Sequence, residues 1–168
     1  MRDRKDFYFN KTINEAQRLV NKNVDINKLM TKKKDGPDIA IIDYGYGNLH
    51  SAKNAFQKII DDTALDQSVR ITNDPEDILK AERLVLPGQG AFGQCMQGLE
   101  KNGEVLEALK ESVLQQKKPF LGICVGMQLL AERGHEFGLT EGLDWVPGDV
   151  VAIENPDKNL KIPHMGWN

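Results

Sequence analysis

A cysteine with a glycine two residues away on either side is the strongest chemical signal in the chain. Cys124 stands between Gly122 and Gly126, after a short apolar run and before a segment with helical periodicity. This is the spacing of a nucleophile elbow, a tight turn that exposes the reactive atom at the carboxyl end of a strand. A helix starting at Val125 would place unpaired N–H groups beside the sulfur and favour the thiolate. We therefore interpret Cys124 as a nucleophile for acyl transfer, with the Val125 N–H donating to the developing oxyanion.

Most free cysteines are small buried hydrophobes, so the context of each cysteine decides its interpretation. Cys124 has the two glycines, a preceding strand and Gln128 one helical turn later, and these favour a nucleophile. Cys95 has none of this context and stands on a helical segment beside Met96, so we interpret it as a packing residue. Two cysteines are too few for a disulfide framework, which fits a reducing cytoplasm.

A second glycine-containing loop is expected to reach the same place. The apolar run 84–86 ends in Pro87, Gly88, Gln89 and Gly90. In a doubly wound sheet such a loop lies at the carboxyl edge and can donate a second backbone N–H to the oxyanion. Without the elbow, an ordinary Pro-Gly turn would explain these residues equally well.

Short apolar runs alternate with helix-period stretches from residue 39 onward, which is typical of a parallel sheet covered by helices. We predict a flavodoxin-like, doubly wound α/β fold with a mostly parallel sheet and helices on both faces. The predicted strands are 39–42, 69–72, 84–86, 120–123 and 150–153. The predicted helices are 49–60, 91–116 with an interruption at Asn102 and Gly103, and 125–131.

The chain divides into a basic N-terminal extension, residues 1–38, and a domain that spans residues 39–168. The extension carries 10 Lys and Arg against 6 Asp and Glu, or +4, whereas the whole chain carries −3. We expect the extension to be partly helical or disordered. The acidic balance gives no reason to expect a nucleic acid or an anionic membrane as partner, and no apolar stretch predicts a membrane span.

The turn at 43–50 also follows a strand and opens a helix, so a dinucleotide-binding loop has to be considered. His50 stands where the third glycine of that pattern would be, so the signal is weak. No spacing of Cys and His residues matches a metal site. We therefore expect no cofactor and no metal.

Four segments together resemble the glutaminase subunit of imidazole glycerol phosphate synthase, a class I (triad) glutamine amidotransferase. They are residues 43–51, 87–92, 122–128 and 163–168, in the order that the family has. The elbow alone indicates the broad class, whereas the D-Y-G-x-G-N-L start and the P-H-M-G-W-N segment point to the histidine-pathway member. The resemblance spans residues 39–168 and leaves the N-terminal extension outside.

The resemblance implies a glutaminase that hydrolyses glutamine through a cysteinyl thioester and passes ammonia to a (β/α)8-barrel cyclase subunit. By position, Cys124 is the nucleophile, Gln128 helps to hold glutamine, and Val125 contributes to the oxyanion region with the loop Gly88, Gln89 and Gly90. The family more often has valine where Gln89 stands, which changes a side chain and not an N–H donor. The implied partner interface consists of Tyr44, Gly45, Asn48, Pro163, His164, Met165, Gly166, Trp167 and Asn168.

The family's catalytic histidine and glutamate come from an H-P-E segment near its C-terminus, and this sequence contains no H-P-E. We interpret His50 as a helix surface residue, His135 as a loop residue and His164 as part of the interface segment. We therefore expect a domain truncated at its C-terminus, with an uncovered sheet edge. Such a chain by itself should hydrolyse glutamine poorly and aggregate.

Two other interpretations stay open. A different cysteine hydrolase on the same kind of sheet would have histidine directly after the nucleophile, where Val125 stands. A non-catalytic protein that keeps only the cyclase-binding surface would fit the absence of H-P-E.

Overall fold

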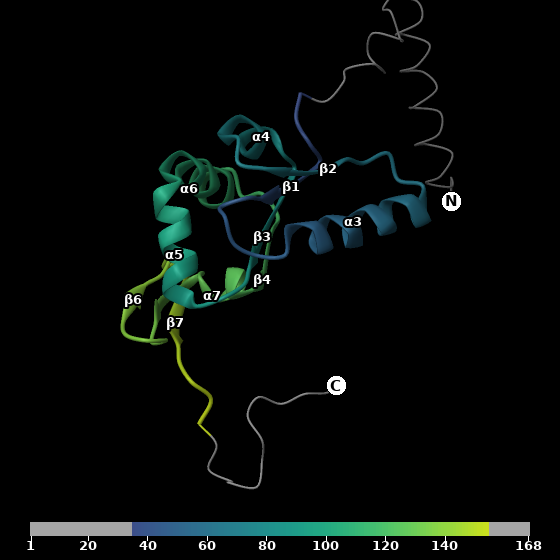
Figure 1. Cartoon of the computed structure of the whole chain (residues 1–168). Coiled ribbons are helices and arrows are strands. Elements are labelled where there is room, and N and C mark those ends of the chain that lie inside the picture. The colour runs from purple at the N-terminus through teal and green to yellow at the C-terminus, as the bar shows by residue number, and fades with distance from the viewer. Residues whose placement is uncertain (1–34, 155–168) are drawn as a thin grey trace, which may run out of the picture. The chain divides into compact units, whose positions relative to one another are not determined.

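Four parallel strands form the central sheet in the order β2-β1-β3-β4 (Figure 1). They are β1 (Ile39–Ile42), β2 (Val69–Thr72), β3 (Arg83–Gly88) and β4 (Phe120–Cys124). In this computed structural model the described residues are 35–154, and from Gly36 onward they belong to one compact unit. The predictions for the N-terminal extension before residue 35 and for the interface segment 163–168 lie outside the described residues.

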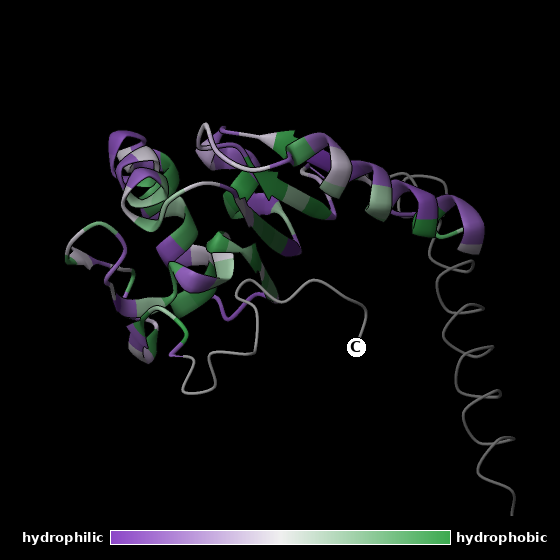
Figure 2. Ribbon diagram, turned by 60° about the horizontal axis from the view of Figure 1, so that its bottom comes forward, coloured by the Kyte–Doolittle hydropathy of each residue, from purple (hydrophilic) through white to green (hydrophobic). Residues whose placement is uncertain are grey.

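Alternate residues of β1 face opposite sides of the sheet, as expected for a strand with a two-residue period. Ala40 and Ile42 pack into a core with the helices of one face, whereas Ile39 and Ile41 pack into a second core that includes α3. Figure 2 shows largely hydrophobic strands beside helices of mixed character. The covering helices are α3 (Leu49–Thr63) on one face, and α4 (Pro75–Lys80), α5 (Phe92–Lys101) and α6 (Gly103–Lys110) on the other. The doubly wound α/β prediction is confirmed.

Three of these elements differ from the prediction. Strand β3 does not stop at Leu86 but continues to Gly88, because Pro87 and Gly88 pair in register with β4. The helical stretch after Ala91 is interrupted at Asn102 as predicted, but it ends in a π-helix, η1 (Glu111–Gln115). Helix α4 was not predicted, although Asp74 before Pro75 is a normal helix start and its side chain accepts the Glu76 N–H at 2.9 Å.

The predicted helix 125–131 is wrong in its length. Helix α7 (Val125–Gln128) has four residues, and the chain then enters a second sheet with the order β6-β5-β7. The carbonyls of Leu129, Leu130 and Ala131, which could have continued the helix, accept N–H groups from residues 143–146 instead. The strands of this sheet are β5 (Ala131–Gly134), β6 (Thr140–Glu141) and β7 (Val146–Val150).

The strand predicted at 150–153 is displaced, because β7 ends at Val150 and the next four residues have no regular structure. No helix among residues 35–154 is long and apolar enough to cross a membrane.

Candidate active site

Cys124 occupies a strained turn between β4 and α7. Its backbone has φ 56° and ψ −121°, a combination that an L-residue adopts at a cost of about 1–3 kcal/mol. It is the last residue of β4 and the N-cap of α7, and its side chain caps no N–H group. The sulfur belongs to an exposed residue rather than to the packed core. The local geometry is therefore that of the predicted elbow.

The two glycines of the elbow allow backbones to approach where no side chain would fit. A Cβ atom on Gly126 would collide with the carbonyl oxygen of Leu86, a backbone atom of the neighbouring strand. A Cβ atom on Gly122 would lie 2.6 Å from the Met127 Cα. Both contacts are with main-chain atoms, which cannot rotate away as a side chain can. The pattern that predicted the elbow thus corresponds to close packing of α7 against β3 and β4.

The loop after β3 lies beside Cys124. In the ladder between β3 and β4, Gly88 is the register partner of Cys124. Gly88 is buried against Val125 and Gly126, whereas Gln89 and Gly90 are exposed. The structure therefore brings the predicted oxyanion loop and Cys124 to the same edge of the sheet. Val125 begins α7, so its N–H has no carbonyl one turn earlier to bond.

The short length of α7 changes the electrostatic argument for Cys124. The sequence predicted a helix of about two turns, whereas α7 has a single turn that ends at Gln128. A helix dipole grows from aligned peptides, so one turn contributes mainly through its free N–H groups. Gln128 is half-buried and lies one turn after Cys124.

The turn after β1 reaches the same edge of the sheet, because β1, β3 and β4 are parallel. Gly45 and Asn48 are exposed, and the Asn48 side chain accepts the Ser51 N–H at 3.1 Å to cap α3. Tyr44 was predicted to lie at the partner interface, but the structure places it in the core. Its side chain is only 2% exposed, because it packs in the core with residues of α5.

Neither histidine in the described residues is hydrogen-bonded to Cys124. His50 is exposed on α3, as predicted. His135 follows β5, and its Nε2 lies 2.6 Å from the Asp149 Oδ2. That contact is the largest cause that lowers the pKa of Asp149, and a hydrogen bond from Arg133 adds to it. His135 thus belongs to an exposed ion-pair cluster of the second sheet.

Two contacts near the site could not be read from the sequence. The Glu136 carboxylate accepts the Phe92 N–H at 2.9 Å, across 44 residues, and so holds the start of α5 directly after the glycine loop. Cys95 is fully buried, as its packing interpretation requires, but its Sγ also donates to the Gln89 carbonyl oxygen at 3.6 Å. In the part of the chain that the structure describes, no group of three His, Cys, Asp or Glu side chains could hold a metal ion.

An exposed cysteine at an elbow on the carboxyl edge of a doubly wound sheet is typical of enzymes with a nucleophilic cysteine. Residues 40–168 match the family described as glutamine amidotransferase class-I. The chain belongs to this family, and the resemblance that its motifs indicated is confirmed.

Comparison with individual proteins is more specific than comparison with the whole family. The chain is 49% identical over 130 residues to the imidazole glycerol phosphate synthase subunit HisH of Rhodopseudomonas palustris, and 52% identical over 130 residues to that of Bradyrhizobium diazoefficiens. In both cases the match covers 77% of this chain and 60% of the relative. It is 44% identical over 137 residues to the HisH subunit of Zymomonas mobilis, covering 82% of this chain and 63% of the relative. The chain therefore spans about 60% of the length of these curated relatives.

Proposed function

We propose that this chain carries the nucleophilic part of the glutaminase of an imidazole glycerol phosphate synthase, in histidine biosynthesis. The observation that carries the proposal is an exposed cysteine at an elbow, in register with Gly88, in a chain about 50% identical to HisH subunits. Cys124 is the nucleophile and Gln128 contacts the substrate glutamine. The N–H groups of Val125 and of the loop Gly88, Gln89 and Gly90 stabilise the oxyanion.

The proposed reaction proceeds through a thioester. The Cys124 sulfur forms a bond to the amide carbon of glutamine, and an electron pair moves to the amide oxygen. When the carbonyl re-forms, the C–N bond breaks and the nitrogen leaves as ammonia with the proton that the thiol gave up. Water then attacks the γ-glutamyl thioester, the C–S bond breaks, and glutamate leaves as the thiol is regenerated. A general base must move these protons, and within residues 35–154 no histidine is hydrogen-bonded to Cys124.

The proposed partner is a cyclase subunit with a (β/α)8 barrel, which receives the ammonia without release to solvent. The relatives are named as subunits of a synthase, and this supports the presence of a partner subunit. We place Gly45 and Asn48 at this interface, because both are exposed on the sheet edge that carries Cys124. The segment Pro163–Asn168, with His164, Met165, Gly166 and Trp167, is proposed to join them. We place the heterodimer in the cytoplasm, where both cysteines would stay reduced.

The test is labelling by 6-diazo-5-oxo-norleucine, an electrophile shaped like glutamine. The purified chain, with and without a cyclase subunit, should gain one adduct on the Cys124 peptide. Labelling should saturate with reagent concentration, and glutamine should protect against it. The Cys124→Ala variant provides the matched control. Absence of an adduct on a folded chain would contradict the proposal and favour a non-catalytic, cyclase-binding protein.

A further inference from the structure

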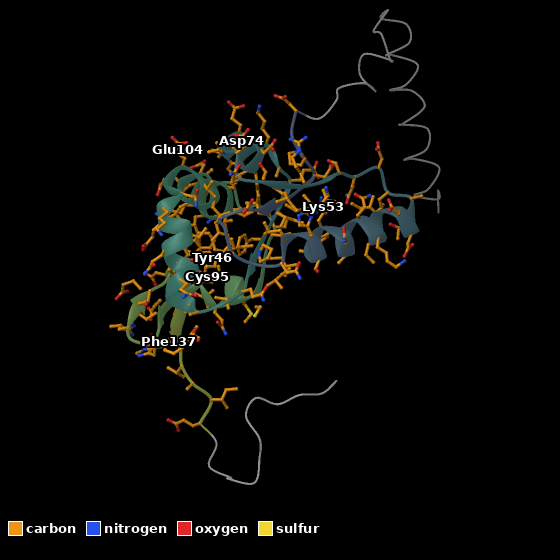
Figure 3. The ribbon with its side chains drawn as sticks, viewed as in Figure 1. Tyr46, Lys53, Asp74, Cys95, Glu104 and Phe137 are labelled. Atoms are coloured by element: carbon orange, nitrogen blue, oxygen red, sulfur yellow. The ribbon has the colours of Figure 1, made fainter. Side chains whose placement is uncertain are left out.

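The thiol of Cys95 lies behind the loop that borders Cys124. Cys95 lies on α5 (Figure 3) and is fully buried. Its Sγ donates to the Gln89 carbonyl at 3.6 Å. Gln89 and Gly90 are both exposed, and Gly90 has φ 110°. Among the described residues no other side chain is hydrogen-bonded to either of them. The thiol is therefore the side-chain restraint on the orientation of this peptide.

The orientation of the carbonyl decides where the next N–H points. In a trans peptide the C=O and the N–H point in opposite directions from the same plane. A Gln89 carbonyl held toward α5 by Cys95 therefore turns the Gly90 N–H away from α5. Since Gly88 is the register partner of Cys124, this peptide follows directly after the residue that lies beside the nucleophile.

Tyr44, in the turn that follows β1, packs in the same core cluster as Cys95. Its hydroxyl is buried and has no hydrogen-bond partner among the described residues. Burial raises the pKa of Tyr44, and the neighbouring Cys95 thiol is the next largest cause.

The same turn touches the end of β3 through its backbone. A Cβ on Gly47 would lie 2.9 Å from the Pro87 carbonyl oxygen, one residue before the loop begins. The Tyr46 ring packs against Gly98 of α5, one helical turn after Cys95, and lies 5.9 Å from the Tyr44 ring between centroids. The turn thus contacts the end of β3 through backbone atoms and packs against α5 beside Cys95.

We propose that Cys95 is a positioning residue for the glutaminase reaction, because its buried thiol holds the Gln89 carbonyl and so fixes the conformation of the loop that borders Cys124. The inference rests on the proposed function of Cys124.

The experiment compares Cys95→Ala and Cys95→Ser in the full 168-residue chain with the cyclase subunit. Two alkylation rates are measured at the Cys124 peptide by mass spectrometry. One reagent is 6-diazo-5-oxo-norleucine, whose ketone oxygen takes the place of the glutamine amide oxygen, and the other is iodoacetamide, which needs no glutamine site. Loss of one hydrogen bond should lower the ratio of the two rates about fivefold in Cys95→Ala. Cys95→Ser keeps a donor and should retain the wild-type ratio.

The outcomes separate the two proposals. If iodoacetamide modifies the wild-type chain and 6-diazo-5-oxo-norleucine does not, the proposed function is wrong. The positioning role of Cys95 is then wrong as well. A labelled wild type with an unchanged ratio in Cys95→Ala would overturn only the positioning role. Equal slowing with both reagents, or a serine variant that behaves like the alanine variant, would also overturn it, because packing rather than the hydrogen bond would then be responsible.

Discussion

At the scale of single residues, the backbone conformation of Cys124 depends on neighbours that have no side chain. Gly126 brings α7 against the Leu86 carbonyl, and Gly88 lies against Val125 and Gly126. These contacts hold the elbow in a backbone conformation that Cys124 would not adopt by itself. Strain at Cys124 is thus maintained by packing of the main chain around it.

Gly126→Ala should therefore destabilise the protein strongly. The added Cβ would overlap the Leu86 oxygen, so α7 must move away from β3. We expect a loss of about 3 kcal/mol in the free energy of unfolding, at the upper end for overpacking. Urea denaturation measures it, with Gly103→Ala as the control because nothing lies within 4 Å of a Cβ there. A similar loss in both variants would show that close packing at residue 126 is not the cause.

The elbow and its cysteine were the features of the site that could be predicted from the sequence. The spacing of Gly122, Cys124 and Gly126 predicts the elbow, because only glycine permits these approaches. Contacts between distant side chains could not be predicted in this way. Glu136 follows its partner Phe92 by 44 residues, and nothing in the residues around either one indicates the other.

At the scale of elements, the small sheet of β5, β6 and β7 is held by an exposed cluster of charges. Asp149 accepts from the Arg133 Nε at 3.0 Å and contacts His135. The same region reaches helix α5, because a Cβ on Gly134 would meet the Phe92 ring. The cluster therefore belongs to a unit that lies against the start of α5.

Acid should weaken this sheet through Asp149. His135 and then Arg133 lower its pKa in the folded protein. A group whose folded pKa is lowered stabilises above its unfolded pKa, so the contribution is lost as the pH falls below about 4. Hydrogen exchange in residues 131–150 should show better protection in the wild type than in Asp149→Asn near pH 6, with the difference shrinking below about pH 4.

The exposed Asp66, outside this sheet, provides the control for that experiment. Asp66→Asn should leave protection of residues 131–150 equal to the wild type at every pH. A protection ratio between wild type and Asp149→Asn that does not vary with pH would show that the carboxylate contributes nothing through its charge.

Elements were predictable where a local pattern determines them. Strands β1 and β2 have the predicted bounds, although only β1 is buried throughout and β2 lies at an edge of the sheet with Arg70 exposed. Helix α7 was predicted too long, because its residues suit a helix and only distant partners at 143–146 end it. Helix α4 was missed although its start signal, Asp74 before Pro75, is local.

At the scale of the whole molecule, β4 forms an edge of the sheet among the described strands and is only partly covered. Leu121 is 49% exposed and Ile123 is 36% exposed. The sequence led us to expect an uncovered sheet edge, but it did not identify β4 as the strand at that edge. Apolar runs show that a strand lies in a sheet, but they do not show which strand lies at its edge. The expectation that the chain aggregates stays a prediction.

The central claim is that the Cys124 sulfur attacks the amide carbon of glutamine, and the most direct measurement is to trap the product. The chain with a cyclase subunit is mixed with glutamine, quenched in acid and mapped by mass spectrometry. We expect a glutamyl adduct on the Cys124 peptide that hydroxylamine removes, as it removes a thioester. A folded chain with no adduct, or with an adduct on the Cys95 peptide instead, would contradict the account.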